Sequence, residues 1–297
     1  MRMFRSTVGR CGVGAFLLLT AVASAACGSS SPNSGGTGTA IPTASLDSSL
    51  AGKVPAKYKS AGLVVAVDAS YAPDELVAAD GHTIIGMDAD LAVAIGQVLG
   101  VSVKLQQATF ATIIPGLLDG KYDVGDSSFT DTKAREKQVD FVDYFSAGEG
   151  FYISSNSSAS FNGLASLCGQ TVSVESGTTE QSDAQSQAKK CKVTVDSFQN
   201  QNEANLAVSS GRAQVGFLDS QVAAYVVQQS NGQFKLTGTP FSTAPYGIAL
   251  PKNSGLATLF LGAIKDLVNS GIYNDILTKW ATTSGAITSF GINGATS

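Results

Sequence analysis

The clearest chemical signal in the sequence is a hydroxyl-rich segment that carries an arginine, residues 127–135. Ser127, Ser128 and Thr130 follow a short apolar run, and Arg135 comes five residues after Thr130. This order predicts a strand, a loop lined by hydroxyl groups and then a helix. Such a loop offers O–H and N–H groups to one small polar ligand, and the forked guanidinium suits a carboxylate. Hydroxyl residues before a helix are also common caps, so the segment by itself leaves both interpretations open.

The composition limits the kind of protein that can present such a loop. The chain has 297 residues, enough for two ordinary domains, with a net charge of −4 and only 14% charged residues. This charge balance predicts no nucleic-acid partner. His82 is the only histidine and no C-x-x-C pair occurs, so we expect neither a metal site nor a cofactor.

The N-terminal residues have the pattern of an export signal. Arg2, Arg5 and Arg10 precede an apolar run over residues 13–23 that is too short to remain as a membrane anchor. We therefore expect residues 1–26 to be a signal peptide and the protein to work outside the cytoplasm.

A cysteine stands where this signal would be cleaved. The segment Ser-Ala-Ala-Cys-Gly at 24–28 resembles a lipoprotein processing site in which Cys27 becomes the lipidated first residue. Ser24 stands where such sites usually carry leucine, and ordinary cleavage after Ala25 would leave Cys27 as a free thiol. A Ser-, Gly- and Thr-rich tract follows, so we expect residues 27–55 to be a flexible linker that tethers the protein to the outer face of the cell membrane.

Two cysteines remain once Cys11 and Cys27 are set aside. These are Cys168 and Cys191, which bracket a predicted strand and helix. Disulfide bonds form and persist in exported proteins, so we expect this pair to be bonded.

Short apolar runs alternate with amphipathic stretches between residues 62 and 280. Strands are predicted at 62–67, 101–105, 171–174, 193–195, 215–219 and 246–250, and helices at 86–99, 110–118, 202–209, 222–227, 256–267 and 271–280. Such alternation predicts βαβ units and an α/β fold with largely parallel sheets.

A series of short motifs runs through the same residues. They are Tyr-Ala-Pro at 71–73, Gly-x-Asp-x-Asp-Leu at 86–91, Ile-Pro-x-Leu at 114–117, Gly-Lys-Tyr-Asp at 120–123, Thr-x-x-Arg at 132–135, Val-Asp-Phe at 139–141, Gly-Thr-Thr-Glu at 177–180, Gly-Arg at 211–212, Tyr-Gly-Ile-Ala at 246–249 and a final Gly-x-Tyr…Lys-Trp at 271–280. Each motif is weak, but the ordered set resembles the amino-acid family, family 3, of extracellular solute-binding proteins, which serve ABC importers.

That resemblance implies the type II periplasmic-binding-protein fold, in which two α/β lobes, each with a mostly parallel sheet flanked by helices, enclose the ligand. The implied divisions are 56–150 plus 246–284 for the first lobe, 151–245 for the second and 285–297 for a disordered tail. Two hinge segments are expected near 148–152 and 243–247, where the chain passes between the lobes and where they would close on a ligand.

The resemblance also assigns roles in binding the main-chain groups of an amino acid. Arg135 would bind the α-carboxylate, and Thr179, at a helix N-terminus, would add an N–H group. Asp219 would accept hydrogen bonds from the α-ammonium. The alternatives are a solvated arginine at 135 and helix caps at Thr179 and Asp219.

Other implied positions surround the side chain of the ligand. Tyr71 and Phe110 would form walls, although Phe110 fits a core residue equally well. Asp68 would reach the distal end of a polar or basic side chain, or else bond the following turn. Ser128 and Thr130 would contribute hydroxyl groups. The roles of Asp126, Asp143 and Glu149 stay open.

The implied function is capture of a free amino acid by a monomeric lipoprotein that delivers it to the permease subunits of an ABC importer. An exported dehydratase-like enzyme on the same fold and a ligand-sensing ectodomain are the alternatives. No Gly-x-Ser-x-Gly elbow and no P-loop occurs, and His82 lies in a predicted turn, so we expect a binding protein and no enzyme. The sequence does not identify the amino acid or the permease.

Overall fold

The computed structural model describes residues 41–295. The expected signal peptide, Cys27 and the first part of the expected linker lie outside the described residues. Within residues 41–295, no helix has both the length and the apolar character needed to cross a membrane.

An eight-stranded mixed sheet is the framework of the fold. Its strands are β1 (Leu63–Val67), β5 (Val103–Gln107), β6 (Val124–Gly125), β7 (Val139–Ser154), β8 (Thr171–Glu175), β9 (Thr194–Phe198), β10 (Val215–Asp219) and β11 (Phe234–Pro251). Their spatial order is β5-β1-β6-β11-β7-β10-β8-β9. The three strands at each end are parallel to one another, whereas β7 and β11 form a long antiparallel pair in the middle.

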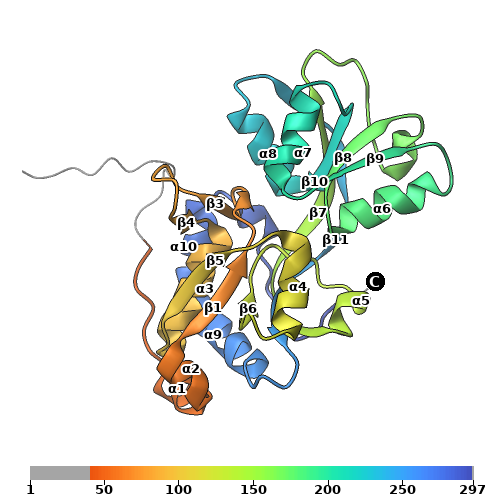
Figure 1. Cartoon of the computed structure of the whole chain (residues 1–297). Helices are drawn as coiled ribbons and strands as arrows, with labels where there is room; N and C mark the ends of the chain where they lie inside the picture. The colour runs from red at the N-terminus through yellow and green to blue at the C-terminus, as the bar shows by residue number, and fades with distance from the viewer. Residues whose placement is uncertain (1–40, 296–297) are drawn as a thin grey trace, which may run out of the picture. The chain divides into compact units, whose positions relative to one another are not determined.

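Helices pack around each end of this sheet and define two lobes (Figure 1). The first lobe carries α1 (Ser48–Lys53), α2 (Ala56–Ala61), α3 (Met87–Leu99), α4 (Phe110–Leu118), α5 (Lys133–Glu136), α9 (Ala257–Asn269) and α10 (Ile272–Lys279), and the second carries α6 (Thr179–Ala188), α7 (Gln201–Ser209) and α8 (Ser220–Gln229). Parallel strands flanked by helices confirm the predicted fold class. A small sheet of β2 (Ser70–Tyr71), β3 (Glu75–Val77) and β4 (Ile84–Ile85) was not predicted.

Strand β1, at the start of the first lobe, is apolar along its whole length because both of its faces are covered. Side chains alternate along a strand, so Leu63, Val65 and Val67 of β1 enter one core, and Val64 and Ala66 enter another. The first core packs under α3, α9 and α10, and the second packs under α4. A strand that is buried on both faces needs a continuous apolar sequence, as β1 has.

The central strands β7 and β11 connect the two lobes (Figure 1). Their pairing is interrupted by register shifts between Thr237 and Phe241, between Phe241 and Ala244, and between Tyr246 and Gly247. Gly148 lies opposite this irregular part, where an added Cβ would come within 2.9 Å of the carbonyl oxygen of Phe241. The irregular pairing falls at the expected hinges, and the closing motion stays a prediction.

The expectation of a flexible linker up to residue 55 is wrong for its last part. Residues 48–53 form α1, which Asp47 caps by accepting hydrogen bonds from the N–H groups of Ser49 and Leu50. Ala44 and Val54 are buried in the first-lobe core, and the Ala44 N–H donates to Gln97 Oε1 at 2.8 Å. A few spaced apolar residues in a polar segment suffice to dock it onto the lobe.

The expectation of a disordered tail from residue 285 is also wrong for the described part. Gly285 lies directly against the ring of Phe145, where any larger side chain would overlap it. The Asn293 side chain accepts from the Phe141 N–H at 2.8 Å and donates to Asp140 Oδ1 at 3.1 Å. Hydrogen bonds of a polar side chain help to hold this tail, and they leave little trace in the pattern of apolar residues.

The disulfide prediction is confirmed. Cys168 and Cys191 are bonded, with 5.6 Å between their Cα atoms, and the bond links the start of the second lobe's strand β8 to the end of α6. It closes a loop with a sequence separation of 23.

Replacing both cysteines by serine should lower the free energy of unfolding by about 3 kcal/mol, because the open chain regains loop entropy in the unfolded state. Urea denaturation of the oxidised protein and of the double variant measures this difference. A reductant should destabilise the wild type by a similar amount and leave the variant unchanged. Equal stability of the oxidised wild type and the variant would contradict the expectation.

Candidate functional site

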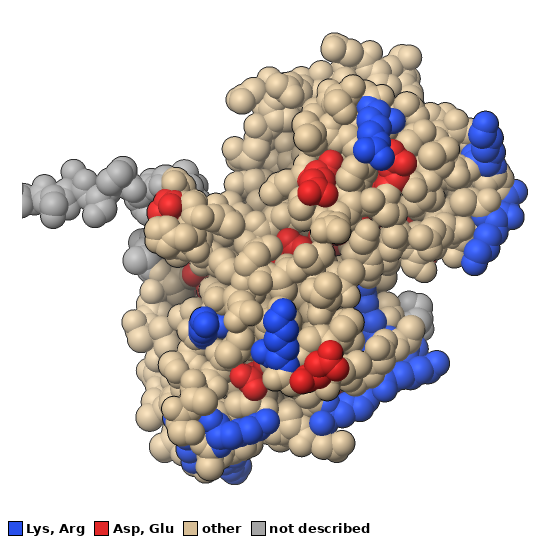
Figure 2. Space-filling model, viewed as in Figure 1, with Lys and Arg blue, Asp and Glu red and all other residues tan. Residues whose placement is uncertain are grey.

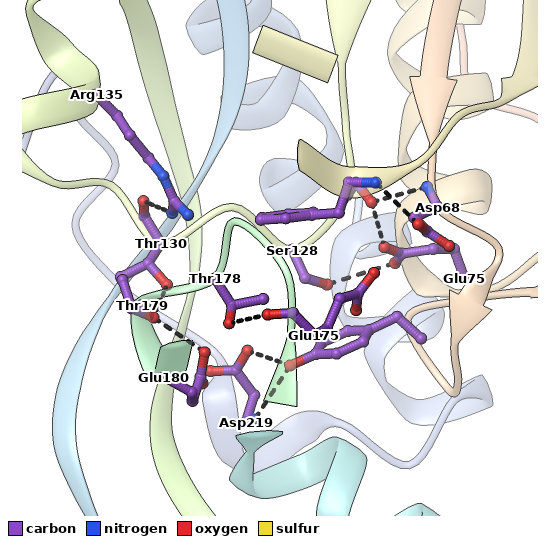
Figure 3. A pocket seen from close by; sticks show the side chains of 13 residues that line it. Asp68, Glu75, Ser128, Thr130, Arg135, Glu175, Thr178, Thr179, Glu180 and Asp219 are labelled. Atoms are coloured by element: carbon purple, nitrogen blue, oxygen red, sulfur yellow. Dashed lines mark hydrogen bonds between the residues drawn. The ribbon is translucent and has the colours of Figure 1, made fainter. Parts of the chain in front are cut away.

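A cavity lies between the two lobes, with about 290 Å³ of empty space, part of which is open to solvent. All eight residues proposed from the sequence line it, namely Asp68, Tyr71, Phe110, Ser128, Thr130, Arg135, Thr179 and Asp219. Five further residues line it that were not proposed as site residues, namely Glu75, Ser127, Glu175, Thr178 and Glu180. Figure 3 shows these side chains converging from both lobes.

The topology explains why residues so distant in sequence meet here. Asp68 directly follows β1, and Asp219 is the last residue of β10. Phe110 and Thr179 are the first residues of α4 and α6. In α/β sheets, ligand sites form at the carboxyl ends of the strands, where the following loops and helix N-termini gather.

Arg135 joins the two lobes at one side of the cavity. Its Nη1 donates to the Thr130 carbonyl at 2.7 Å, and its Nη2 donates to the Gly177 carbonyl of the second lobe at 2.9 Å. The guanidinium also lies 5.5 Å from the ring centre of Phe110 and 5.4 Å from that of Phe129. These contacts fix the plane of the fork, and a guanidinium has further N–H donors for a carboxylate.

Asp219 lies at the other side of the cavity and is buried. It precedes α8, but its side chain makes no capping hydrogen bond, so the helix-cap interpretation does not account for it. Its Oδ2 instead accepts from the hydroxyl of Tyr71, a first-lobe residue, at 2.7 Å. Burial raises the pKa of Asp219 to about 6, although the Tyr71 hydrogen bond and the charge of Arg135 act in the opposite direction.

Asp68 is held by the first lobe. Its Oδ2 accepts from the Phe110 N–H at 2.9 Å, and its Oδ1 has only a 3.5 Å contact with Gln107 Nε2. These partners lie in another loop, so the side chain does not simply bond its own turn. Phe110 stacks on Phe129 with ring centres 4.4 Å apart while it also lines the cavity, so it is a core residue and a wall at once.

The hydroxyl residues divide into two groups. The Ser128 hydroxyl donates to Asp74 Oδ2 at 2.9 Å, so it is engaged with buried carboxylates behind the cavity. Thr130 and Thr179, from opposite lobes, have their hydroxyl oxygens 3.4 Å apart. The cap of α6 is Thr178, which accepts from the Gln181 N–H, and this leaves the Thr179 hydroxyl free of a capping role.

The three acidic residues whose roles were open lie in different places. Glu149 lines a groove that adjoins the cavity and shares Arg135 and Asp219 with it. Asp126 and Asp143 are buried but do not line the cavity. Among the described residues, no group of three or more His, Cys, Asp or Glu side chains could hold a metal ion.

The residues that sequence reasoning missed make the cavity strongly acidic. Five carboxyl groups line it, those of Asp68, Glu75, Glu175, Glu180 and Asp219, against the single cation of Arg135. Burial raises the pKa of Glu75, Glu175 and Glu180 well above the usual range. On the outer face seen in Figure 2, by contrast, Lys and Arg side chains are scattered and form no continuous patch. The cavity therefore has an excess of carboxyl groups that only a cation or bound protons can neutralise.

Buried carboxyl groups in the cavity and outside it predict how the stability of the free protein depends on pH. Burial raises the pKa of Asp219 to about 6, of Asp131 to about 7 and of Glu149 to about 8. Unfolded carboxyl groups titrate near pH ~4. The folded state thus binds more protons than the unfolded state between these values, and its stability is lost as the pH rises through them.

We therefore expect the free energy of unfolding to fall as the pH rises from about 5 to about 8. Urea denaturation across this range measures it, and Glu149→Gln should flatten the upper part of the curve, because the pKa of Glu149 is raised to about 8. A stability that rises steadily across the range would contradict the assignment.

Comparisons with known proteins bear on this site. The family model described as bacterial extracellular solute-binding proteins, family 3, matches residues 63–283. The arginine-binding protein ArgT of Corynebacterium glutamicum is 30% identical over 79% of both chains. The ABC transporter glutamine-binding protein GlnH of Bacillus subtilis is 34% identical over 66% of this chain and 72% of its own.

Solved structures are similar over most of the described part of the chain. An ancestral arginine-binding protein bound to arginine has a TM-score of 0.70 and 37% identity, with 73% of this chain and 97% of the other covered. An ancestral amino acid-binding protein described as a precursor of cyclohexadienyl dehydratase has a TM-score of 0.68 and 32% identity, with 73% and 94% covered.

Proposed function

Because the chain belongs to the bacterial extracellular solute-binding proteins of family 3, we propose that it captures a free amino acid with a polar or basic side chain and delivers it to the permease subunits of an ABC importer. The relatives described as arginine- or glutamine-binding proteins support this class of ligand. The ligand would bind in the cavity between the lobes, which would close on it by a change at the central strands β7 and β11.

One observation carries the proposal, namely that Arg135 and Asp219 line a single cavity from opposite lobes. An amino acid presents a carboxylate and an ammonium on one carbon atom. A guanidinium on one side and a carboxylate on the other match that pair of charges. Thr179 adds a hydroxyl group and the N-terminus of α6 close to Arg135.

The same chemistry leaves an enzyme as the second candidate. Burial raises the pKa of Glu175 and Glu180 well above the usual range, and a protonated carboxyl group in a closed cavity is what an acid catalyst needs. One structural neighbour is described as a precursor of a dehydratase, yet it is itself described as amino acid-binding. The similarity to binding proteins favours binding without turnover.

We also propose that the protein is a monomeric lipoprotein on the outer face of the cell membrane, exported by residues 1–26 and anchored through Cys27. The supporting observations are the basic and apolar segments ahead of Cys27 and the disulfide between Cys168 and Cys191, a bond typical of exported proteins.

Thermal unfolding of the purified protein in the presence of each standard amino acid tests the proposed function. A ligand at 100 times its Kd stabilises the native state by about 2.7 kcal/mol. We expect a small set of polar or basic amino acids to raise the Tm and to be recovered unchanged after incubation. Stabilisation by none of them would refute amino-acid binding, and recovery of a dehydrated product would favour the enzyme.

A further inference from the structure

We propose that Glu175 determines the specificity of the site, because Glu175 and Asp68 form a paired-carboxyl site for the cationic end of the ligand's side chain. The pair comes from opposite lobes, so a positive charge between the two carboxyl groups would stabilise the contact between the lobes. This inference rests on the proposed function and narrows its ligand to an amino acid with a guanidinium or ammonium side chain.

The position of Glu175 is that of a binding group and not of a structural one. It is the last residue of β8, its side chain lines the cavity, and only 2% of its surface is exposed. Its Oε1 is buried and has no hydrogen-bond partner. The buried carboxyl groups of Asp126, Asp131 and Asp143 also have oxygens without a partner, but these residues do not line the cavity. An unpartnered oxygen on a residue that does line the cavity points to a partner that is brought from outside.

Asp68 faces Glu175 from the first lobe and has capacity for the same partner. One of its oxygens is held by the Phe110 N–H, and the other has only the long contact with Gln107. Burial, and then the negative charge of Asp68 and a hydrogen bond to it, raise the pKa of Glu175. Without a ligand, Glu175 therefore keeps its proton more readily than an ordinary carboxyl group does.

The other charged groups at the cavity cannot replace that proton. Glu180 and Asp219 add negative charge near Glu175, and Glu75 lines the same cavity. Arg135 is the only cation among the lining residues, and it is held by the carbonyl groups of Thr130 and Gly177. Figure 3 places Asp68 and Glu75 on the opposite side of the pocket from Arg135.

A bound ligand would thus extend between two subsites, one that prefers a negative charge and one that prefers a positive charge. Its α-carboxylate would lie at Arg135, and a guanidinium or ammonium at the far end would displace the proton of Glu175. An amide side chain could form hydrogen bonds there but would leave the carboxyl groups without a counter-charge. The paired site therefore separates ligands by charge even when their length is similar.

Calorimetric titration of Glu175→Gln with L-arginine, L-lysine and L-glutamine at about pH 8 tests the inference, with the exposed Glu203→Gln on α7 as the matched control. We expect the variant to lose at least about 30-fold in affinity for arginine and lysine, because it leaves a buried cation with one carboxylate fewer. Its affinity for glutamine should change less than about threefold or increase. The control should bind all three as the wild type does.

Proton release gives a second readout that a purely structural role would not change. Arginine binding to the wild type, measured in buffers of different ionisation enthalpy, should release about one proton more than binding to Glu175→Gln. Asp68→Asn, an independent variant, should lower the ratio of arginine to glutamine affinity in the same direction.

The outcomes distinguish this inference from the proposed function. If the wild type binds none of the three amino acids, this inference is overturned, whereas the proposed function is overturned only if no standard amino acid stabilises the protein. If the wild type binds them and Glu175→Gln weakens all three equally, or changes none, only the role of Glu175 is overturned. Should Glu175→Gln fail to fold, as its thermal melt would reveal, Asp68→Asn and the proton release of the wild type decide the question.

Discussion

Replacing Arg135 by alanine is expected to weaken amino-acid binding by ~2–5 kcal/mol, because it leaves the α-carboxylate of the ligand unpaired inside a closed cavity. A decarboxylated analogue of the ligand should lose little, since it has no group for Arg135 to bind. The matched control is Arg212→Ala, which removes an exposed arginine that pairs with Asp196 at 2.8 Å and does not line the cavity.

Calorimetric titrations of the two arginine variants with the amino acid and with its decarboxylated analogue measure these effects. A thermal melt of each free variant checks folding, because Arg135 also contacts the rings of Phe110 and Phe129. Wild-type affinity in folded Arg135→Ala would mean that the arginine only links Thr130 to Gly177 across the lobes.

Replacing Asp219 by alanine is the second large effect that we expect, again ~2–5 kcal/mol in binding free energy. The α-ammonium of the ligand would then lie buried without its acceptor, and the hydroxyl of Tyr71 would lose its 2.7 Å partner. An analogue of the ligand without the α-ammonium should bind the variant and the wild type about equally. Asp196→Ala is a control in the same lobe that removes a carboxylate outside the cavity.

Measuring both the affinity and the thermal stability of Asp219→Ala separates a role in ligand binding from a role in folding. Since the Asp219 side chain makes no capping bond to α8, its loss should leave the thermal stability of the free protein nearly unchanged or slightly higher. A large fall in Tm with unchanged affinity would return Asp219 to the role of a helix cap.

The sequence predicted those parts of the fold that short-range periodicity controls. The helix expected at 110–118 has those limits in the structure, because Phe110, Ile113 and Leu117 recur at the spacing of one buried helix face. The long pair β7 and β11 was largely missed. Strand β7 is buried along almost its whole length although it carries acidic residues and glycines. Strand β11 is largely exposed before Tyr246 and buried from Tyr246 to Leu250, so neither strand has a regular apolar pattern.

The candidate site could be predicted where ordered motifs marked it. Eight residues chosen from the hydroxyl-rich segment and from the family resemblance line one cavity, although their roles in binding stay predictions. Glu180 lay inside the Gly-Thr-Thr-Glu motif and Glu175 directly followed a predicted strand, but neither was proposed as a site residue. Whether such a side chain enters the cavity depends on the neighbouring lobe, and spacing along the chain does not encode that contact.

At both ends of the described chain, the sequence predicted less order than the structure has. The segments around Ala44 and Asn293 look like linker and tail by composition, yet they are held by the hydrogen bonds of Ala44 to Gln97 and of Asn293 to Phe141 and Asp140. Such contacts require a complementary surface elsewhere in the fold. Composition alone therefore overestimated disorder at residues 41–55 and 285–295.

The central claim is that the cavity binds a free amino acid as a zwitterion between Arg135 and Asp219. Calorimetric titration of the wild-type protein with its preferred amino acid, and with analogues lacking either the α-carboxylate or the α-ammonium, tests it most directly. We predict saturable one-to-one binding of the amino acid and a loss of at least about 2 kcal/mol for each analogue. Equal affinity for the amino acid and both analogues, or binding of none, would contradict the claim.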